Sequence, residues 1–174
     1  RGVKMQVVFD GKGFKAEQIA AAQFNGSLVT DLAQQYKDID VMIKAKDGSI
    51  KSVSVKDQLW SSEKFGGIQI ETVTTNTRTG QTMPGCFYQN ESDYYFWRIH
   101  TKQYGDTWLV VESSVMKQYV AENASHLRAW ATKPATEAKN RSYNRRYDRT
   151  EGMVIQVAEA VKLGKLIPVK ETLQ

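Results

Sequence analysis

The sequence lacks the residues that several common kinds of small protein need. Cys86 is the only cysteine among 174 residues, so no internal disulfide can form and a reducing compartment is favoured. One cysteine and two histidines are too few for a structural zinc site, which takes several of these side chains. A P-loop, a GxGxxG motif, heptads and internal repeats are absent as well.

Long apolar runs are also missing. No stretch approaches the roughly 20 apolar residues of a membrane span, and the first residues contain no apolar stretch typical of a signal peptide. We therefore expect no membrane partner. Hydrophobic residues make up 41% of the chain and charged residues 25%, which is typical of a globular protein. This length and composition predict a single domain over residues 1–174.

Positive charge exceeds negative charge, with 24 Lys and Arg against 19 Asp and Glu. Much of the excess lies in a polar stretch at about residues 132–150, which we expect to form a surface loop or arm. Arginine suits phosphate better than lysine does, so contact with a DNA backbone is favoured over a merely solvated loop. The candidate nucleic-acid-binding residues of this arm are Lys139, Arg141, Tyr143, Arg145, Arg146 and Arg149.

A β-hairpin is predicted in the first half of the chain. Val41 and Ile43 alternate with polar neighbours, the Lys-Asp-Gly-Ser stretch at 46–49 makes a turn, and residues 50–55 form the return strand. A third strand is predicted at residues 68–71, where Glu71 faces away from the two isoleucines.

Apolar periodicity predicts the other elements. Helices are expected at residues 14–24, 28–36, 114–123 and 151–163, and the third of these is expected to be capped by Ser113 or Ser114. An aromatic hairpin is expected from strands at 94–100 and 107–111, and a loop at 75–85.

Three charged residues on these three strands, which we expect to be neighbours, indicate a candidate active site. Asp40 and Glu71 can bind Mg²⁺, and Lys56 can orient the attacking water or neutralise charge that develops on phosphorus. Asp38 is a rival for the first acid, but Asp40 directly precedes the apolar run. Glu63 is a rival for the second acid, but it lies in a serine-rich turn.

The order of these elements resembles the PD-(D/E)XK nuclease superfamily over residues 14–119. A helix with Glu17 comes first, then a strand with Asp40, then a strand ending in Val-Lys at Lys56. The resemblance implies an α/β (α+β) fold with a restriction-endonuclease-like core, in which a central mixed β-sheet is flanked by helices. It also implies that Glu17 assists catalysis, that the Val55 carbonyl is a further metal ligand, and that Gln58 contacts the substrate.

The sequence departs from the superfamily pattern at Ser54, two residues before Lys56. A serine cannot replace a carboxylate as a charged Mg²⁺ ligand. Some members of the superfamily have the same serine and supply the missing acid from a later position. Glu71 looks like that displaced acid.

These observations predict a DNA endonuclease that hydrolyses phosphodiester bonds with Mg²⁺ (or Mn²⁺). The resemblance implies the cytoplasm of a bacterial or phage-infected cell, and a homodimer is expected if both DNA strands are cut. The alternative is a non-catalytic nucleic-acid-binding protein on a degenerate nuclease fold, for which Ser54 is the reason. A protein whose basic arm binds an acidic protein surface is a third, weaker reading.

Overall fold

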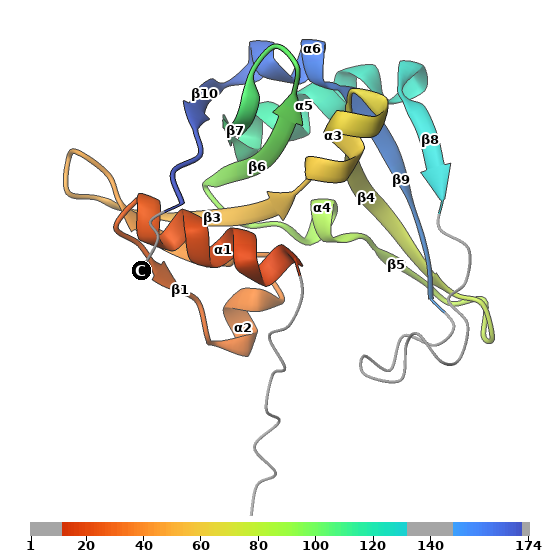
Figure 1. Ribbon diagram of the computed structural model, residues 1–174. Helices are drawn as coiled ribbons and strands as arrows, with labels where there is room; N and C mark the ends of the chain where they lie inside the picture. Colours follow the sequence, from red (N-terminus) through yellow and green to blue (C-terminus); the bar gives the residue numbers. More distant parts are fainter. Residues whose placement is uncertain (1–11, 132–147, 172–174) are drawn as a thin grey trace, which may run out of the picture.

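The computed structural model describes residues 12–131 and 148–171, which form two β-sheets with helices around them (Figure 1). In chain order the elements are α1 (Lys12–Gln23), β1 (Ser27–Leu28), α2 (Leu32–Gln35), β2 (Val41–Lys44), β3 (Ile50–Asp57), α3 (Leu59–Phe65), β4 (Gly67–Asn76), β5 (Thr82–Pro84), α4 (Cys86–Gln89), β6 (Tyr94–Thr101), β7 (Gly105–Glu112), α5 (Ser113–Asn123), the 3-10 helix η1 (Ala124–His126), β8 (Arg128–Ala131), β9 (Asp148–Gln156), α6 (Val157–Ala160), the 3-10 helix η2 (Val161–Leu163) and β10 (Lys165–Pro168). None of the helices in the described ranges is long and apolar enough to cross a membrane.

The larger sheet has six strands in the order β1-β2-β3-β6-β7-β10. Its pairs are antiparallel except β3 with β6, which are parallel, so the sheet is mixed. The predicted mixed α/β fold, with a central mixed sheet flanked by helices, is confirmed. Both predicted hairpins, β2–β3 and β6–β7, are confirmed as well.

Helix α1 covers one face of the larger sheet. Its small residues Ala16 and Ala20 are buried against Val41, Val53 and Phe96, because alanine lets a helix approach a sheet closely. The helix ends at Gln23 and is followed by a left-handed turn. Asn25 adopts a left-handed backbone with φ of 50°, and the Gly26 amide donates to the Ala21 carbonyl at 2.8 Å.

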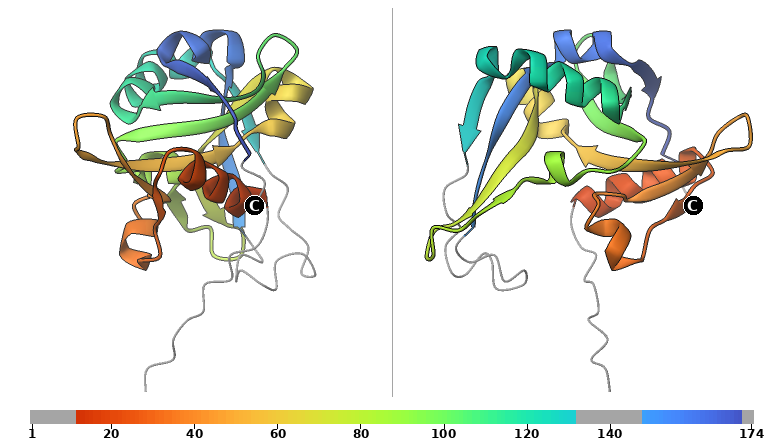
Figure 2. Two further views of the ribbon diagram at one scale, coloured as in Figure 1. Left: turned by 60° about the vertical axis from the view of Figure 1, so that its left-hand side comes forward. Right: turned by 180° about the vertical axis from the view of Figure 1, so that it is seen from behind.

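The other face of the larger sheet packs against the second sheet. Tyr95 and Trp97 alternate with Phe96 along β6 and so point away from α1, into a core shared with Ile70 of β4 and Ile155 of β9. Met116 of α5 joins the same core. Figure 2 shows α5 and the second sheet on the side of the larger sheet opposite α1.

The second sheet has the order β5-β4-β9-β8, and all its pairs are antiparallel. The expectation that β4 neighbours the β2–β3 hairpin is therefore wrong. Helix α3 separates β3 from β4 and ends at Gly66, whose left-handed backbone (φ 62°) turns the chain into the second sheet. The serine-rich turn expected around Glu63 is this helix.

Two predicted helices are wrong because strand pairing prevails over the apolar pattern. Residues 28–36 split into β1, which pairs with β2, and the short helix α2, whose first turn Asp31 caps by accepting from the Ala33 amide at 2.9 Å. Residues 151–156 lie in β9, where the β-branched Val154 and Ile155 pair with β4. Helix α6 begins only at Val157.

The expected loop at 75–85 is shorter than predicted, and the last three residues of the expected arm at 132–150 lie in β9. Strand β4 continues to Asn76 and pairs with β5, and β9 begins at Asp148, opposite Asn76. The predicted cap of α5 is also wrong, because its N-cap is Glu112 and no side chain of that residue caps the helix. The Ser113 hydroxyl instead contacts the Ser92 hydroxyl at 3.1 Å.

We predict that Gly152→Ala strongly destabilises the second sheet. A Cβ at Gly152 would lie 1.8 Å from the Ile70 carbonyl oxygen and 2.7 Å from the Trp130 indole nitrogen. We expect a loss of about 3 kcal/mol or more of unfolding free energy, measured by urea denaturation.

The control is Gly80→Ala, where a Cβ meets nothing within 4 Å and only the left-handed backbone (φ 73°) is strained. That change should cost about 1 kcal/mol. Equal losses in the two variants contradict the close packing of β4 on β9.

Candidate active site

The structure brings four of the predicted site residues to one cavity of about 670 Å³. Glu17 comes from α1, Asp40 directly precedes β2, Lys56 lies near the end of β3, and Glu71 lies on β4. The register of the β2–β3 hairpin brings Asp40 close to Val55 of β3. The Val55 amide therefore donates to the Asp40 carboxylate at 2.7 Å. Val55 and Gln58 line the same cavity.

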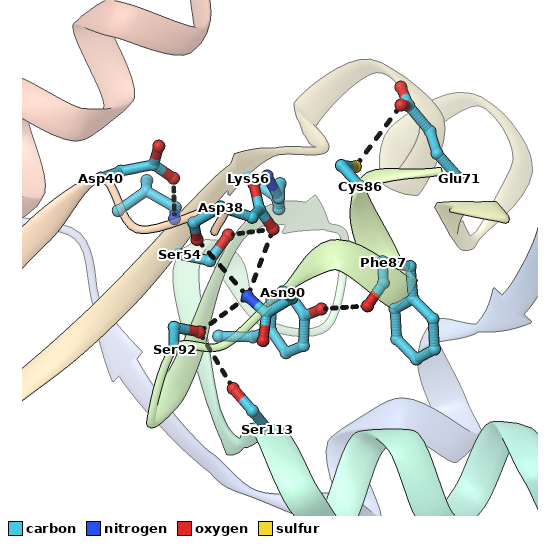
Figure 3. A network of polar contacts seen from close by, with 12 residues as sticks. Asp38, Asp40, Ser54, Lys56, Glu71, Cys86, Phe87, Asn90, Ser92 and Ser113 are labelled. Carbon is cyan, nitrogen blue, oxygen red and sulfur yellow. Dashed lines mark hydrogen bonds and ion pairs between the residues drawn. The ribbon is translucent and has the colours of Figure 1, made fainter. Parts of the chain in front are cut away.

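Lys56 forms its ion pair with Asp38 rather than with Asp40 (Figure 3). The Asp38 carboxylate also accepts from the Ser54 hydroxyl at 2.8 Å and from the Asn90 amide nitrogen at 3.2 Å. Ser54 and Lys56 share a face of β3, and the short serine leaves space in which the Asp38 carboxylate lies. Asp38 thus supplies the carboxylate that lies beside Lys56.

The charge of Lys56 is fixed by these neighbours. Burial alone would lower the pKa of its ammonium group, but the carboxylates of Asp38 and Asp40 raise that pKa well above its ordinary value. Lys56 is therefore protonated at neutral pH. It can orient water or neutralise a phosphate, but it cannot act as a general base.

Two carboxyl groups at the cavity carry a charge that is poorly compensated. Burial and, less strongly, the Asp40 carboxylate raise the pKa of Glu17 from 4.5 to about 7, although Lys56 opposes the shift. Burial also raises the pKa of Asp40, again with Lys56 opposing. Carboxylates that are desolvated and close to one another favour a proton or a cation.

Glu71 lies on a β-bulge. The register of β4 with β9 shifts between Glu71 and Val73, and the Gly85 amide donates to the Thr72 carbonyl at 2.9 Å. A Cβ at Gly85 would lie 2.5 Å from the Glu71 carbonyl oxygen, so only glycine allows this approach. Bulges of this kind change the direction in which a side chain points.

The Glu71 carboxylate points toward Cys86. The Cys86 thiol donates to it at 3.4 Å, and burial raises the pKa of that thiol to about 12, so the thiol stays protonated. Figure 3 shows the Glu71 carboxyl group separated from Asp40, with Lys56 and Cys86 between them. The two acids therefore line one cavity from different sheets, and not from neighbouring strands as expected.

The side chain of Gln58 joins the two sheets. Its amide oxygen accepts from the Gln69 amide at 2.9 Å and from the Ser61 hydroxyl at 2.7 Å, and its amide nitrogen donates to the Gln69 carbonyl at 3.3 Å. Gln58 was expected to contact substrate. In the structure its side chain holds the start of β4 against the end of β3.

The carboxylates of this cavity are compatible with a divalent ion that has few protein ligands and keeps several of its waters. Within residues 12–131 and 148–171, no three His, Cys, Asp or Glu side chains are grouped closely enough to hold a metal ion. Mg²⁺ is commonly held by only one or two carboxylates and keeps several waters. Asp40 offers one hard oxygen ligand of this kind, and the carboxylates of Glu17 and Glu71 line the same cavity.

Most of the predicted basic arm lies outside the described residues. Lys139, Arg141, Tyr143, Arg145 and Arg146 fall there. Arg149 is described: it lies on β9 opposite Thr75, is exposed, and forms an ion pair with Glu151 at 3.3 Å.

Three residues at the site have no signal in the sequence. Asn90 is buried, and its side-chain amide donates to both the Asp38 carboxylate and the Ser92 hydroxyl. The main-chain carbonyl of Asn90 accepts from the Lys117 ammonium group. Arg98 lines the cavity. Trp60 also lines it, on a helix that sequence periodicity does not reveal.

Comparison with known proteins adds no relative to this geometry. No family model matches the chain, and neither a curated protein nor a solved structure is significantly similar to it. Functional inference therefore depends on the residues of the cavity.

We predict a pH-dependent stability that depends on Glu17. A carboxyl whose pKa is raised by folding binds its proton more tightly in the folded state, so stability falls as the pH rises from about 4.5 to about 7. Without divalent cations, the wild type should lose about 1–2 kcal/mol over this range, after allowance for solvent screening. Glu17→Gln should lack that part of the loss in urea denaturation at pH 5 and pH 8.

Glu91→Gln is the control, because Glu91 is exposed and pairs with Lys37 at the surface. Its stability curve should follow that of the wild type. A Glu17→Gln curve that also follows the wild type shows that the carboxyl is not desolvated.

Proposed function

We propose that the protein is an Mg²⁺- or Mn²⁺-dependent DNA endonuclease. The observation that carries the proposal is a permanently charged lysine beside two desolvated carboxylates, at a cavity large enough for a backbone phosphate. Phosphodiester hydrolysis needs a divalent cation and a positive group near the phosphate. The order of α1, β2 and β3 supports a restriction-endonuclease-like core of the PD-(D/E)XK type.

Each residue has a role in this proposal. Asp40, Glu71 and the Val55 carbonyl would hold the ion, and Glu17 would assist through the water shell of the ion. A bound ion supplies Lewis-acid activation of the phosphate and lowers the pKa of a bound water. Lys56 positions the attacking water, while Asp38, Ser54 and Asn90 hold the ammonium group in place.

The second sheet offers a place for the DNA backbone. Figure 2 shows β4, β5 and β9 extending together away from the larger sheet. Arg149 lies on this extension, in β9. An exposed arginine there can contact a backbone phosphate.

A non-catalytic nucleic-acid-binding module is the second candidate. Two observations favour it: Ser54 stands where the superfamily has an acid, and Glu71 lies apart from Asp40. Such a module binds DNA in a salt-sensitive manner without metal and leaves it uncut.

Cleavage of plasmid DNA with Mg²⁺ or Mn²⁺ distinguishes the two candidates. We predict that Lys56→Ala and Asp40→Ala each lower the cleavage rate by about 100-fold or more, as expected for loss of electrostatic stabilisation. Lys51→Ala is the matched control, because this lysine lies on the same strand but lines a different cavity. It should cut at the rate of the wild type. Cleavage by both site variants at that rate contradicts the nuclease proposal.

Metal binding is predicted to be detectable without activity. At Mn²⁺ about 100-fold above its Kd, the melting temperature of the wild type at pH 8 should rise by roughly 5 °C or more. The rise should be much smaller in Asp40→Asn and Glu71→Gln, and unchanged in the surface control Glu91→Gln. A full rise in Asp40→Asn excludes Asp40 as a ligand, and a full rise in Glu71→Gln excludes Glu71.

A further inference from the structure

An exposed aromatic pair lies at the edge of the candidate active site. Trp60 and Phe65 are both on α3, which is labelled in Figure 1, and remain 61% and 53% exposed. Their rings meet edge to face, with centroids 5.0 Å apart and an interplanar angle of 81°. Large apolar side chains exposed together commonly mark a binding surface.

Trp60 differs from the other exposed aromatics because it lines the same cavity as Asp40 and Lys56. It also differs from the other tryptophans. Trp97 and Trp108 are buried, and the Trp130 indole donates to the Ile70 and Met153 carbonyls. Trp60 is therefore the exposed indole of the described chain.

The setting of Trp60 fits a nucleobase more closely than an apolar protein surface. Lys15 and Lys56 line the same cavity as Trp60, and Lys56 keeps its positive charge there. Cations and an open ring at one cavity match the phosphate and the base of a nucleotide. The rings of Phe65 and Trp60 meet edge to face, and this contact restrains the indole before a ligand arrives.

On the basis of the proposed nuclease function, we propose that Trp60 stacks on an unpaired base next to the scissile phosphate. The preferred substrate is accordingly a nucleic acid with a single-stranded or splayed segment. In an intact duplex the faces of the bases are covered by their neighbours, so an indole can stack only on a base that has left the helix. Phe65 supports the indole.

Binding of three DNA probes tests this inference. The probes are an oligothymidylate of about 20 nucleotides, a forked duplex and a blunt duplex, and binding is measured by fluorescence anisotropy without divalent cations. We expect Trp60→Ala to weaken binding of the first two probes by about 5- to 100-fold and binding of the blunt duplex by less than about twofold. Trp60→Phe, which keeps an aromatic face, should recover most of the affinity.

Tyr88→Ala is the matched control, because Tyr88 is 54% exposed but does not line the cavity. It should bind all three probes like the wild type. An equal loss for all three probes in Trp60→Ala, or no loss, overturns the inference. A wild-type dimer that becomes a monomer in Trp60→Ala overturns it too, because the pair is then a protein interface.

The result is separable from the nuclease proposal. Selective binding through Trp60 without metal-dependent cleavage retains the base contact and rejects the nuclease. Cleavage that depends on Lys56, with unchanged binding by Trp60→Ala, retains the nuclease and rejects the base contact.

Discussion

The ion pair between Lys56 and Asp38 is the constraint on which the site depends. A buried ammonium group without a partner would cost several kcal/mol, so the chain has to place a carboxylate beside it. Asp38 achieves this with a left-handed backbone (φ 57°), and Ser54 and Asn90 donate to the same carboxylate. Because Asn90 follows α4, this one carboxylate joins the β2–β3 hairpin to a segment about fifty residues later.

This pairing also determines the charge of the cavity. Since Asp38 neutralises Lys56 at close range, the remaining carboxylates are left with insufficient positive charge. Burial and mutual repulsion then raise the pKa of Glu17 and of Asp40. A divalent cation relieves this repulsion more effectively than a second lysine would, because it brings two charges and accepts several oxygen ligands.

Local periodicity accounts for the parts that the sequence predicts. Alternation at Val41, Ile43, Val53 and Val55 specifies the hairpin, and the hairpin register alone brings Asp40 near Lys56. The errors arise where long-range pairing decides. The apolar pattern at residues 151–163 fits a helix as well as a strand. Pairing with β4 makes residues 151–156 of this stretch a strand. Likewise, no local pattern places Asn90 beside Asp38, which is a contact across 52 residues.

The connection between the two sheets explains why the site and the aromatic pair lie together. The chain leaves β3 after Lys56, forms α3 with Trp60, and enters β4, where Glu71 lies on the bulge. The Gln58 side chain fixes both ends of this connection through the main chain of Gln69. One short segment therefore carries the lysine, the exposed indole and the second acid. A change in the position of α3 would therefore move Trp60 relative to Lys56 and Glu71, which lie on the strands before and after it.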